Sequence, residues 1–496
     1  MGDVGKLYFG TLVGTGTYIR HQPGIDHAGR CGCAPTDWTW LCRERAIIRS
    51  LQFPQIVDRE TSILDAHRAT FEWAFGQDKS NLAEWLSGAS GIYWVSGKAG
   101  SGKSTLLKFL TGHRRTEELL QEWSGGKTLV TASHFFWAQG TALQKSHQGL
   151  LQTLLCQVLQ KHPEQVSVIS PTRWSSWTDM QAPWSLSELS KCFQSMASTK
   201  HFRICLFVDG LDEYQGDHQD LIEILEGWSL SENIKICASS RPWVEFTSAF
   251  GSGHWKLQVQ DLTRQDISNY STDKLKSHKD IDSYGSEVDS IAQEISLRAQ
   301  GVFLWVYLVV RSLIRGMRYM DTIEDLWERL NELPTDLEEY FRRMLDSIEP
   351  IYRKRTARAL RVLSQIESEM DKPLHVITFY FMDLEMKDPE YAFSSLESPA
   401  PGQENRFYTR LEGEKQHQLV AQCRDLVHIS VITSLNGQTV HPPWSMSVSF
   451  LHRTVADFLT ASEVHRMLIS RSGDDFDPRG SICRSYLAQV KNTNLI

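Results

Sequence analysis

The chain has 496 residues, of which 41% are hydrophobic and 23% charged, so it is long enough for about three domains and is not a disordered polymer. Its 52 Lys and Arg against 60 Asp and Glu give a net charge of −8, which argues against a protein that coats nucleic acid. Nine cysteines, an odd number, indicate reduced thiols, and the most apolar run, 302–310, is too short to span a bilayer. We therefore expect a cytoplasmic, multidomain protein without a membrane span and without a nucleic-acid partner.

The first part of the chain changes character near residue 46. Residues 1–45 are rich in glycine and polar side chains, show no periodicity, and are expected to form a poorly ordered leader. Apolar residues at helical spacing then predict a helical lead-in over 46–88.

Five apolar runs predict the buried strands of one sheet. They are residues 91–96, 128–137, 202–208, 234–239 and 255–259. Helical patterns separate these runs, and two of the helices open with capping-box spacing, at Ser185 with Glu188 and at Thr263 with Asp266. Strands that alternate with helices predict an α/β domain, with a five-stranded parallel sheet and helices on both faces.

After about residue 265 the strand signals nearly disappear, and the chain is expected to be mainly helical. The predicted helices are 287–316, 322–332, 335–348 and 350–369. A short strand over 448–451 is expected to lead into a helix over 454–461. The polar segment 385–412 contains several prolines and glycines and is predicted to be a loop.

A glycine-rich turn directly after the first strand fits the phosphate-binding pattern G-x-x-x-x-G-K-[ST]. Its glycines let backbone N–H groups curl around phosphate oxygens, and the following helix adds its positive N-terminal dipole. Lys103 is expected to reach the β- and γ-phosphates, and Ser104 to bind Mg²⁺. A chance match in a glycine-rich turn would lack this context of strand before and helix after. The predicted nucleotide ligands are Gly97, Gly100, Ser101, Gly102, Lys103, Ser104 and Thr105.

Acidic and basic residues follow the next two strands that are expected beside this loop. Asp209 comes directly after the strand over 202–208 and is expected to hold Mg²⁺, directly or through water. Glu213, together with Asp212, could polarise an attacking water. Arg241 ends the following strand, where it could sense the γ-phosphate. The plain alternatives are an acidic turn and a surface ion pair.

These segments together resemble the NACHT group of STAND signalling NTPases, and most closely the fungal branch related to the nephrocystin-type module. The resemblance rests on GIYWVSGKAGSGKST from residue 91, FVDGLDE from 207, ASSRP from 238 and FLHRTVADFL from 450. It spans about residues 50–465. The P-loop occurs in many NTPases, whereas DGLDE, SSRP and FLHRTVADFL in this order are specific.

The resemblance implies an α/β P-loop NTPase followed by an α-helical region and a winged-helix-like domain. The implied divisions are an NTPase domain at 89–262, a helical domain at 263–349, a winged-helix-like domain at 350–465 and a helical tail at 466–496. His452 matches the family histidine that contacts the β-phosphate of ADP and locks the closed state. In related receptors a proline touches adenine, but the matching stretch here, which begins at Gly301, has none.

The function implied is that of a switch related to the NOD-like receptors. ADP with Mg²⁺ would hold a closed monomer, and exchange for ATP would open it for self-association and for signalling through protein partners. Slow hydrolysis of ATP could reset the switch. A metabolic P-loop kinase or ATPase, a helicase-like or AAA+ motor, and a nucleotide-binding scaffold without catalysis remain as alternatives. Because such switches usually carry an effector domain and a repeat sensor, we expect either a short natural form or a truncated gene model.

Overall fold

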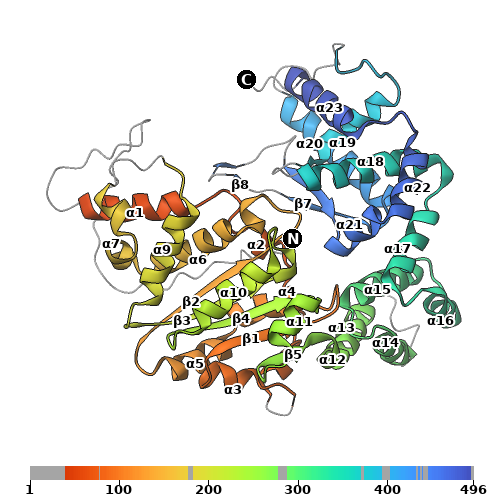
Figure 1. Ribbon diagram of the computed structural model, residues 1–496. Helices are drawn as coiled ribbons and strands as arrows, with labels where there is room; N and C mark the ends of the chain where they lie inside the picture. Colours follow the sequence, from red (N-terminus) through yellow and green to blue (C-terminus); the bar gives the residue numbers. More distant parts are fainter. Residues whose placement is uncertain are drawn as a thin grey trace, which may run out of the picture.

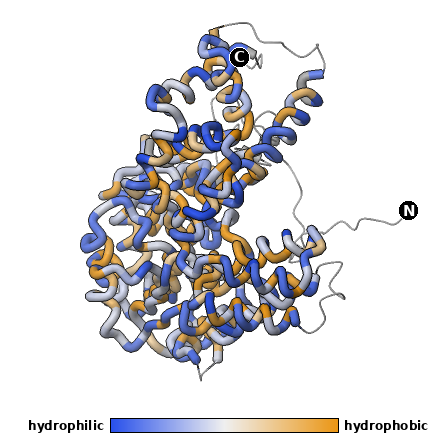
Figure 2. Tube along the Cα trace, turned by 90° about the vertical axis from the view of Figure 1, so that its right-hand side faces the viewer, coloured by the Kyte–Doolittle hydropathy of each residue, from blue (hydrophilic) through white to orange (hydrophobic). Residues whose placement is uncertain are grey.

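The computed structural model describes residues 39–76, 79–176, 182–277, 287–369, 374–393, 403–431, 434–435, 438–439 and 445–492. An α/β domain comes first, and helices dominate the rest of the chain (Figure 1). The amphipathic helices show as alternating hydrophobic and hydrophilic stretches along the tube (Figure 2). None of the described helices has the length and apolar character needed to cross a membrane.

Helix α1 (Thr39–Leu51) begins inside the segment that was expected to be a leader. Ile47 and Leu51 are fully buried in the same core as helix α6 (His147–Lys161), and Gln152 donates a hydrogen bond from Nε2 to the Leu51 carbonyl at 3.3 Å. The prediction for residues 39–45 was wrong, because this packing stabilises a helix that the local composition does not predict. The rest of the predicted leader lies outside the described residues.

The predicted five-stranded parallel sheet is confirmed, with the order β2-β3-β4-β1-β5. Its strands are β1 (Gly91–Ser96), β2 (Thr128–Phe135), β3 (Phe202–Asp209), β4 (Ile234–Ser240) and β5 (Lys256–Gln258). All four strand pairings are parallel, so the carboxyl ends of the strands meet at one edge. The order places the end of β1, which leads into the P-loop, next to the end of β4 and one strand away from β3.

Helices cover both faces of this sheet, because alternate residues of each buried strand point to opposite sides. Ile204, Leu206 and Val208 of β3 join one core, while Cys205 and Phe207 join the other. The first core also contains residues of α1, α6, α7 (Val166–Ile169), α9 (Leu186–Ala197), α10 (His218–Ser229) and α11 (Val244–Phe250), beside which lie η3 (Pro163–Gln165) and α8 (Pro171–Ser175). The second core contains residues of η1 (Glu72–Phe75), α3 (Leu82–Ser87), α4 (Lys103–Gly112) and α5 (Arg114–Ser124). Figure 1 shows α1, α6 and α9 on one side and α3 and α5 on the other.

A helical region follows the sheet. It contains α12 (Val259–Leu262), α13 (Arg264–Lys276), α14 (Glu287–Arg298), α15 (Phe303–Arg318), α16 (Ile323–Glu332) and α17 (Leu337–Asp346). The single helix predicted over 287–316 is two helices, because Gln300 and Gly301 have φ values of 47° and 78° that interrupt the helical backbone. The predicted capping box at Thr263 is also wrong, since Asp266 is used elsewhere and accepts bonds from Phe71 N and Trp73 Nε1.

The C-terminal region combines helices with a small antiparallel sheet of order β6-β10-β7. Its elements are α18 (Pro350–Glu369), β6 (Leu374–His375), α19 (Val376–Glu385), α20 (Glu404–Gln422), β7 (Val427–Val431), β8 (Ser434–Leu435), β9 (Gln438–Thr439), β10 (Met446–Phe450), α21 (Arg453–Thr460), α22 (Ser462–Ser472) and α23 (Pro478–Asn492). Helices predominate in this region, as expected, and the small sheet lies among them. Residues 404–412, predicted to be loop, form the first turns of α20, with Leu411 buried against its neighbours.

The helical and C-terminal regions share one hydrophobic core, which extends from Ile267 to Ile482. We call residues 264–492 the C-terminal body. The cores of the sheet domain contain no residue of this body. The molecule is therefore built from a sheet domain and a C-terminal body, each packed around its own apolar side chains.

Candidate functional site

The P-loop has the backbone geometry that its glycines predict. Gly100 and Gly102 adopt positive φ values of 71° and 94°, which strain any other residue. A Cβ on Gly97 would come within 2.5 Å of Ser101 Oγ. That hydroxyl is buried and has no hydrogen-bond partner among the described residues, which fits a loop shaped to receive an oxygen-rich ligand.

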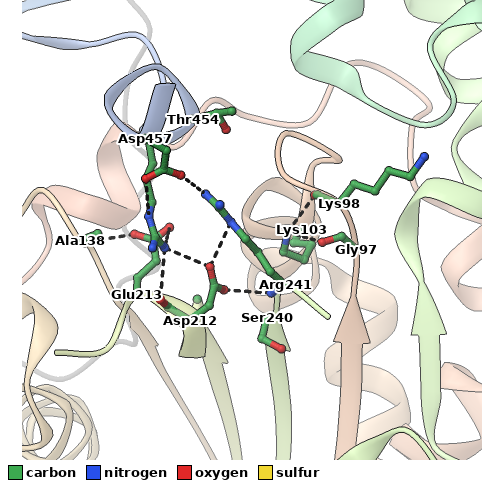
Figure 3. Close-up of polar contacts among 12 residues, drawn as sticks. Gly97, Lys98, Lys103, Ala138, Asp212, Glu213, Ser240, Arg241, Thr454 and Asp457 are labelled. Atoms are coloured by element: carbon green, nitrogen blue, oxygen red, sulfur yellow. Dashed lines mark hydrogen bonds and ion pairs between the residues drawn. The ribbon is translucent and has the colours of Figure 1, made fainter. Parts of the chain in front are cut away.

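Lys103 is the first residue of α4 and folds back over this loop. Its Nζ donates to the carbonyl oxygens of Gly97 at 2.9 Å and Lys98 at 3.1 Å (Figure 3). Burial lowers the pKa of Lys103, and the carboxylates of Asp212 and Asp209 partly oppose that effect.

Ser104 and Asp209, the two predicted metal ligands, lie in contact. Asp209 ends β3 and is buried; it accepts hydrogen bonds from Ser104 and, at 2.5 Å, from Ser239 Oγ of β4. Burial raises the pKa of Asp209, and these two hydrogen bonds oppose that effect. A hydroxyl and a carboxylate oxygen side by side are suitable donors for Mg²⁺, so the residues present fit the predicted ion.

Asp212 and Glu213 lie in the short turn η4 (Leu211–Glu213), directly beyond Asp209. Glu213 Oε2 accepts a hydrogen bond from Ala138 N at 2.8 Å, and burial raises the pKa of this carboxyl. Asp212 Oδ1 accepts one from Arg241 N at 3.0 Å, and Asp212 Oδ2 pairs with Arg241 Nε at 3.2 Å. The sequence placed these three residues correctly at the strand ends.

A basic residue that the sequence analysis did not consider connects these acids to the C-terminal body. Arg453 Nη1 of α21 lies 3.0 Å from Asp212 Oδ2 and 3.8 Å from Glu213 Oε1. Arg241 Nη2 pairs at 3.0 Å with Asp457 Oδ2 of the same helix, so Arg241 lies between Asp212 and Asp457 (Figure 3). We call Asp212, Glu213, Arg241, Arg453 and Asp457 the interdomain charge network. The sequence already contains this pattern, because Arg453 and Asp457 are four residues apart and therefore lie on one face of the helix that follows His452.

His452 is the N-cap residue of α21, and its Nδ1 accepts a hydrogen bond from Thr454 N at 3.1 Å. A neutral imidazole that accepts at Nδ1 carries its proton on Nε2, so Nε2 is a donor. Burial lowers the pKa of His452 to about 3, and the positive charges of Arg59 and Arg241 add to that effect. The ring is therefore neutral at physiological pH.

A cavity of about 290 Å³ lies between the P-loop, the ends of β3 and β4, and the C-terminal body. Lys103, Ser104, Asp209, Glu213 and His452 line its polar end. Four aromatic residues also line the cavity and form what we call its aromatic wall: Phe71, Tyr270, Phe303 and Tyr307. The sequence pattern did not predict this wall, although Phe303 and Tyr307 are four residues apart on α15 and therefore share one face of that helix.

Helix α15 is attached directly to the P-loop. Its Leu304 N donates to Gly100 O at 3.1 Å, and a Cβ on Gly100 would come within 2.8 Å of Leu304 Cβ. The stretch in which the sequence lacks the expected proline therefore contacts the cavity through its aromatic and leucine side chains.

Two segments of the chain match known family models. Residues 69–241 match nephrocystin 3, N-terminal. The matched segment contains the P-loop and strands β1 to β4 of the sheet. This nephrocystin-type domain contains every predicted site residue except His452. Residues 347–496 match a domain of unknown function, which includes His452 and Arg453.

Three solved structures that are similar to the chain differ from it strongly in sequence. Cdc6p from Pyrobaculum aerophilum is 13% identical over 83% of this chain and 98% of its own, with a TM-score of 0.35. The Aeropyrum pernix Orc1 protein, solved in complex with DNA, is 13% identical over 78% and 92%, with a TM-score of 0.32. Drosophila ORC, bound to DNA, gives 12% over 76% and 91%, with a TM-score of 0.29. These low scores support no functional statement about the chain, and no curated protein sequence matches it.

Proposed function

We propose that the protein is a nucleotide-dependent switch of the STAND type that binds ADP or ATP with Mg²⁺ and alternates between a closed and an open form. The observation that carries the proposal is the interdomain charge network. Arg453 and Asp457 of the C-terminal body engage Asp212 and Arg241, the residues that would serve a bound triphosphate. Nucleotide chemistry and domain closure thus depend on the same side chains.

The proposed roles follow from the geometry of each side chain. Lys103 would leave the carbonyls of Gly97 and Lys98 to bind the β- and γ-phosphates. Ser104 and Asp209 would hold Mg²⁺, which when bound neutralises phosphate charge. His452 would donate from Nε2 to the β-phosphate, which requires the neutral tautomer that Thr454 selects.

Two contacts favour a slow rather than a fast ATPase. Glu213 is the proposed acid that orients the attacking water, yet its Oε2 accepts from Ala138 N and Arg453 lies on its other side. Asp212 is paired with Arg241 and Arg453 in the same arrangement. Hydrolysis would then require movement of α21, so turnover would follow opening. A scaffold that never hydrolyses ATP is the second candidate. The observation that favours it is that Ala138 N and Arg453 already engage the Glu213 carboxylate.

The wider proposals concern partners and location. Opening would expose the face of α21 that now covers the phosphate end, and we propose self-association and protein signalling partners for that form. The described cysteines are all free thiols, which supports a reducing, cytoplasmic setting.

The nucleotide site is tested by Lys103→Ala in the full chain, with binding of ADP and of ATP measured by calorimetry. Loss of an ammonium that contacts two phosphates is expected to weaken both affinities by about 100-fold or more. Lys98→Ala is the matched control, because Lys98 belongs to the same loop and points away from Lys103 (Figure 3). Unchanged affinity in Lys103→Ala would contradict the proposed site.

A measurement of molecular mass in solution distinguishes the switch from the scaffold. The switch predicts a monomer with ADP and a larger species with a non-hydrolysable ATP analogue, whereas the scaffold predicts one mass for both. The same samples, followed through a single turnover of ATP, give the hydrolysis rate.

A further inference from the structure

The phosphate end of the cavity contains a basic residue from outside the nephrocystin-type segment. Arg59 belongs to the short helix α2 (Asp58–Ser62), and it lies ten positions before the matched segment 69–241 begins. Its side chain lines the cavity together with Lys103, Asp209 and His452. The sequence pattern predicts only a helical lead-in for this segment.

The segment that carries Arg59 is held in place on both sides. Before α2, Gln144 Nε2 donates to the Gln55 carbonyl at 2.9 Å. After α2, Lys108 Nζ of helix α4 donates to the Ile63 carbonyl at 2.6 Å, and the Ile63 side chain is buried. Both anchors come from the NTPase domain, so Arg59 has a defined position relative to the P-loop.

Arg59 differs from the other basic residues around this end of the cavity in having no acceptor. Arg241 and Arg453 are engaged by Asp212 and Asp457, and Lys103 donates to two carbonyls. Arg59 makes no side-chain hydrogen bond or ion pair with any residue that the structure describes, and its Nε is buried. The ring of Trp137 lies 5.8 Å from its guanidinium carbon. A buried guanidinium nitrogen without an acceptor is unfavourable unless a ligand supplies one.

The position of Arg59 indicates which part of a nucleotide it would meet. Arg59 lies beside Trp137, and the next residue, Ala138, donates from its N to Glu213 Oε2 at 2.8 Å. Arg59, Asp209 and Glu213 line the same cavity. Asp209 is the proposed metal ligand and Glu213 the proposed acid for the attacking water. A cation near both lies on the side of the last phosphate rather than of the base.

We propose that Arg59 binds the terminal phosphate of ATP and so distinguishes ATP from ADP. This inference rests on the proposed function. The planar guanidinium can donate two parallel hydrogen bonds to phosphate oxygens, an arrangement that a diphosphate cannot complete at the same place. Arg241, by contrast, is engaged by Asp212 and Asp457 in the present arrangement, so Arg59 is the guanidinium that is available before the network separates.

The test compares Arg59→Gln with the full-length wild type in calorimetry with ADP and with a non-hydrolysable ATP analogue. The affinity for the triphosphate is expected to fall by about 10- to 100-fold, as for a charged hydrogen bond, while the affinity for ADP stays within about twofold. Arg49→Gln is the matched control, since Arg49 is exposed on the preceding helix α1 and its replacement removes the same charge. Arg59→Met, which keeps an aliphatic stem beside Trp137, repeats the test if the glutamine variant does not fold.

The outcomes distinguish this inference from the proposed function. If the wild type binds no nucleotide, the proposed function fails and the inference fails with it. If the wild type binds both nucleotides and Arg59→Gln binds them equally well, only the inference about Arg59 is wrong. An equal loss for ADP and for the triphosphate analogue also overturns it, because Arg59 would then not read the terminal phosphate.

Discussion

At the phosphate end of the cavity there are more positively charged side chains than carboxylates that are free to pair with them. Arg241 and Arg453 pair with three carboxylates, those of Asp212, Glu213 and Asp457. Asp209 accepts hydrogen bonds from the hydroxyls of Ser104 and Ser239. Among the described residues, the Lys103 ammonium donates only to backbone carbonyls, and the Arg59 guanidinium makes no hydrogen bond or ion pair and lies near the Trp137 ring. A nucleotide phosphate would meet these two cations without first breaking an ion pair.

A buried histidine in β2 makes the stability of the sheet domain depend on pH. His134 is 3% exposed, its Nε2 has no hydrogen-bond partner among the described residues, and burial lowers its pKa from 6.5 to about 3. The unfolded chain therefore binds a proton below pH 6.5 that the folded chain does not. This histidine contributes its full stability above pH 6.5, and that contribution is lost as the pH falls toward 3.

Between pH 6 and pH 4, the free energy of unfolding of the wild type is expected to fall by about 2.5 kcal/mol more than that of His134→Leu. Urea unfolding at the two pH values measures this difference, and His465→Gln, at an exposed position, serves as the control. If the wild type and His134→Leu lose the same free energy of unfolding, His134 is not the group that titrates.

At the scale of elements, the sequence predicted what local pattern determines. The strand runs, the P-loop turn and the positions of Asp209 and Arg241 depend on neighbours in the chain, and the structure agrees with them. The division of 287–316 at Gly301 depends instead on a contact with Gln260, which is 41 residues away in the sequence. Arg59 and Arg453 were missed for the same reason, because only the tertiary fold brings them to the strand ends.

The break between α14 and α15 is tested by Gly301→Ala. Its φ of 78° disfavours alanine, and the added Cβ would lie 2.3 Å from Gln260 O, a backbone atom that cannot move alone. We expect a loss of at least about 2 kcal/mol in the free energy of unfolding, from backbone strain and overpacking together. Gly227→Ala, in α10 with no atom within 4 Å of the new Cβ, should instead stabilise the protein by about 0.5–1 kcal/mol. Equal effects in denaturant unfolding would contradict this interpretation of Gly301.

At the scale of the molecule, each body is held together by apolar packing, whereas the interdomain charge network that joins α21 to the strand ends is polar. Arg453, for example, is 18% exposed and its partner Asp212 only 3%. Polar contacts of this kind can separate and be hydrated at low cost, while separation within a hydrophobic core exposes apolar area to water. The C-terminal body is therefore expected to move as a unit.

Arg453→Ala should shift the molecule toward the open form by about 1–3 kcal/mol, the value of a charged hydrogen bond. An increase in the radius of gyration, measured by X-ray scattering without nucleotide, would show this shift. Arg342→Ala is the control, because it removes an exposed ion pair with Glu463 that lies within the C-terminal body. Identical scattering from Arg453→Ala and the wild type, with and without an ATP analogue, would exclude a role for this contact in closure.

The shared core of the C-terminal body has a kinetic consequence. Leu304, bonded to the P-loop at Gly100, and His452, at the polar end of the cavity, belong to this one body. The parts of the cavity formed by α15 and by α21 would then separate from the sheet domain in a single step. The base would therefore not leave the cavity before the phosphates. Dissociation of each nucleotide would then follow a single rate constant, set by the rate at which the whole body separates from the sheet domain with that nucleotide bound.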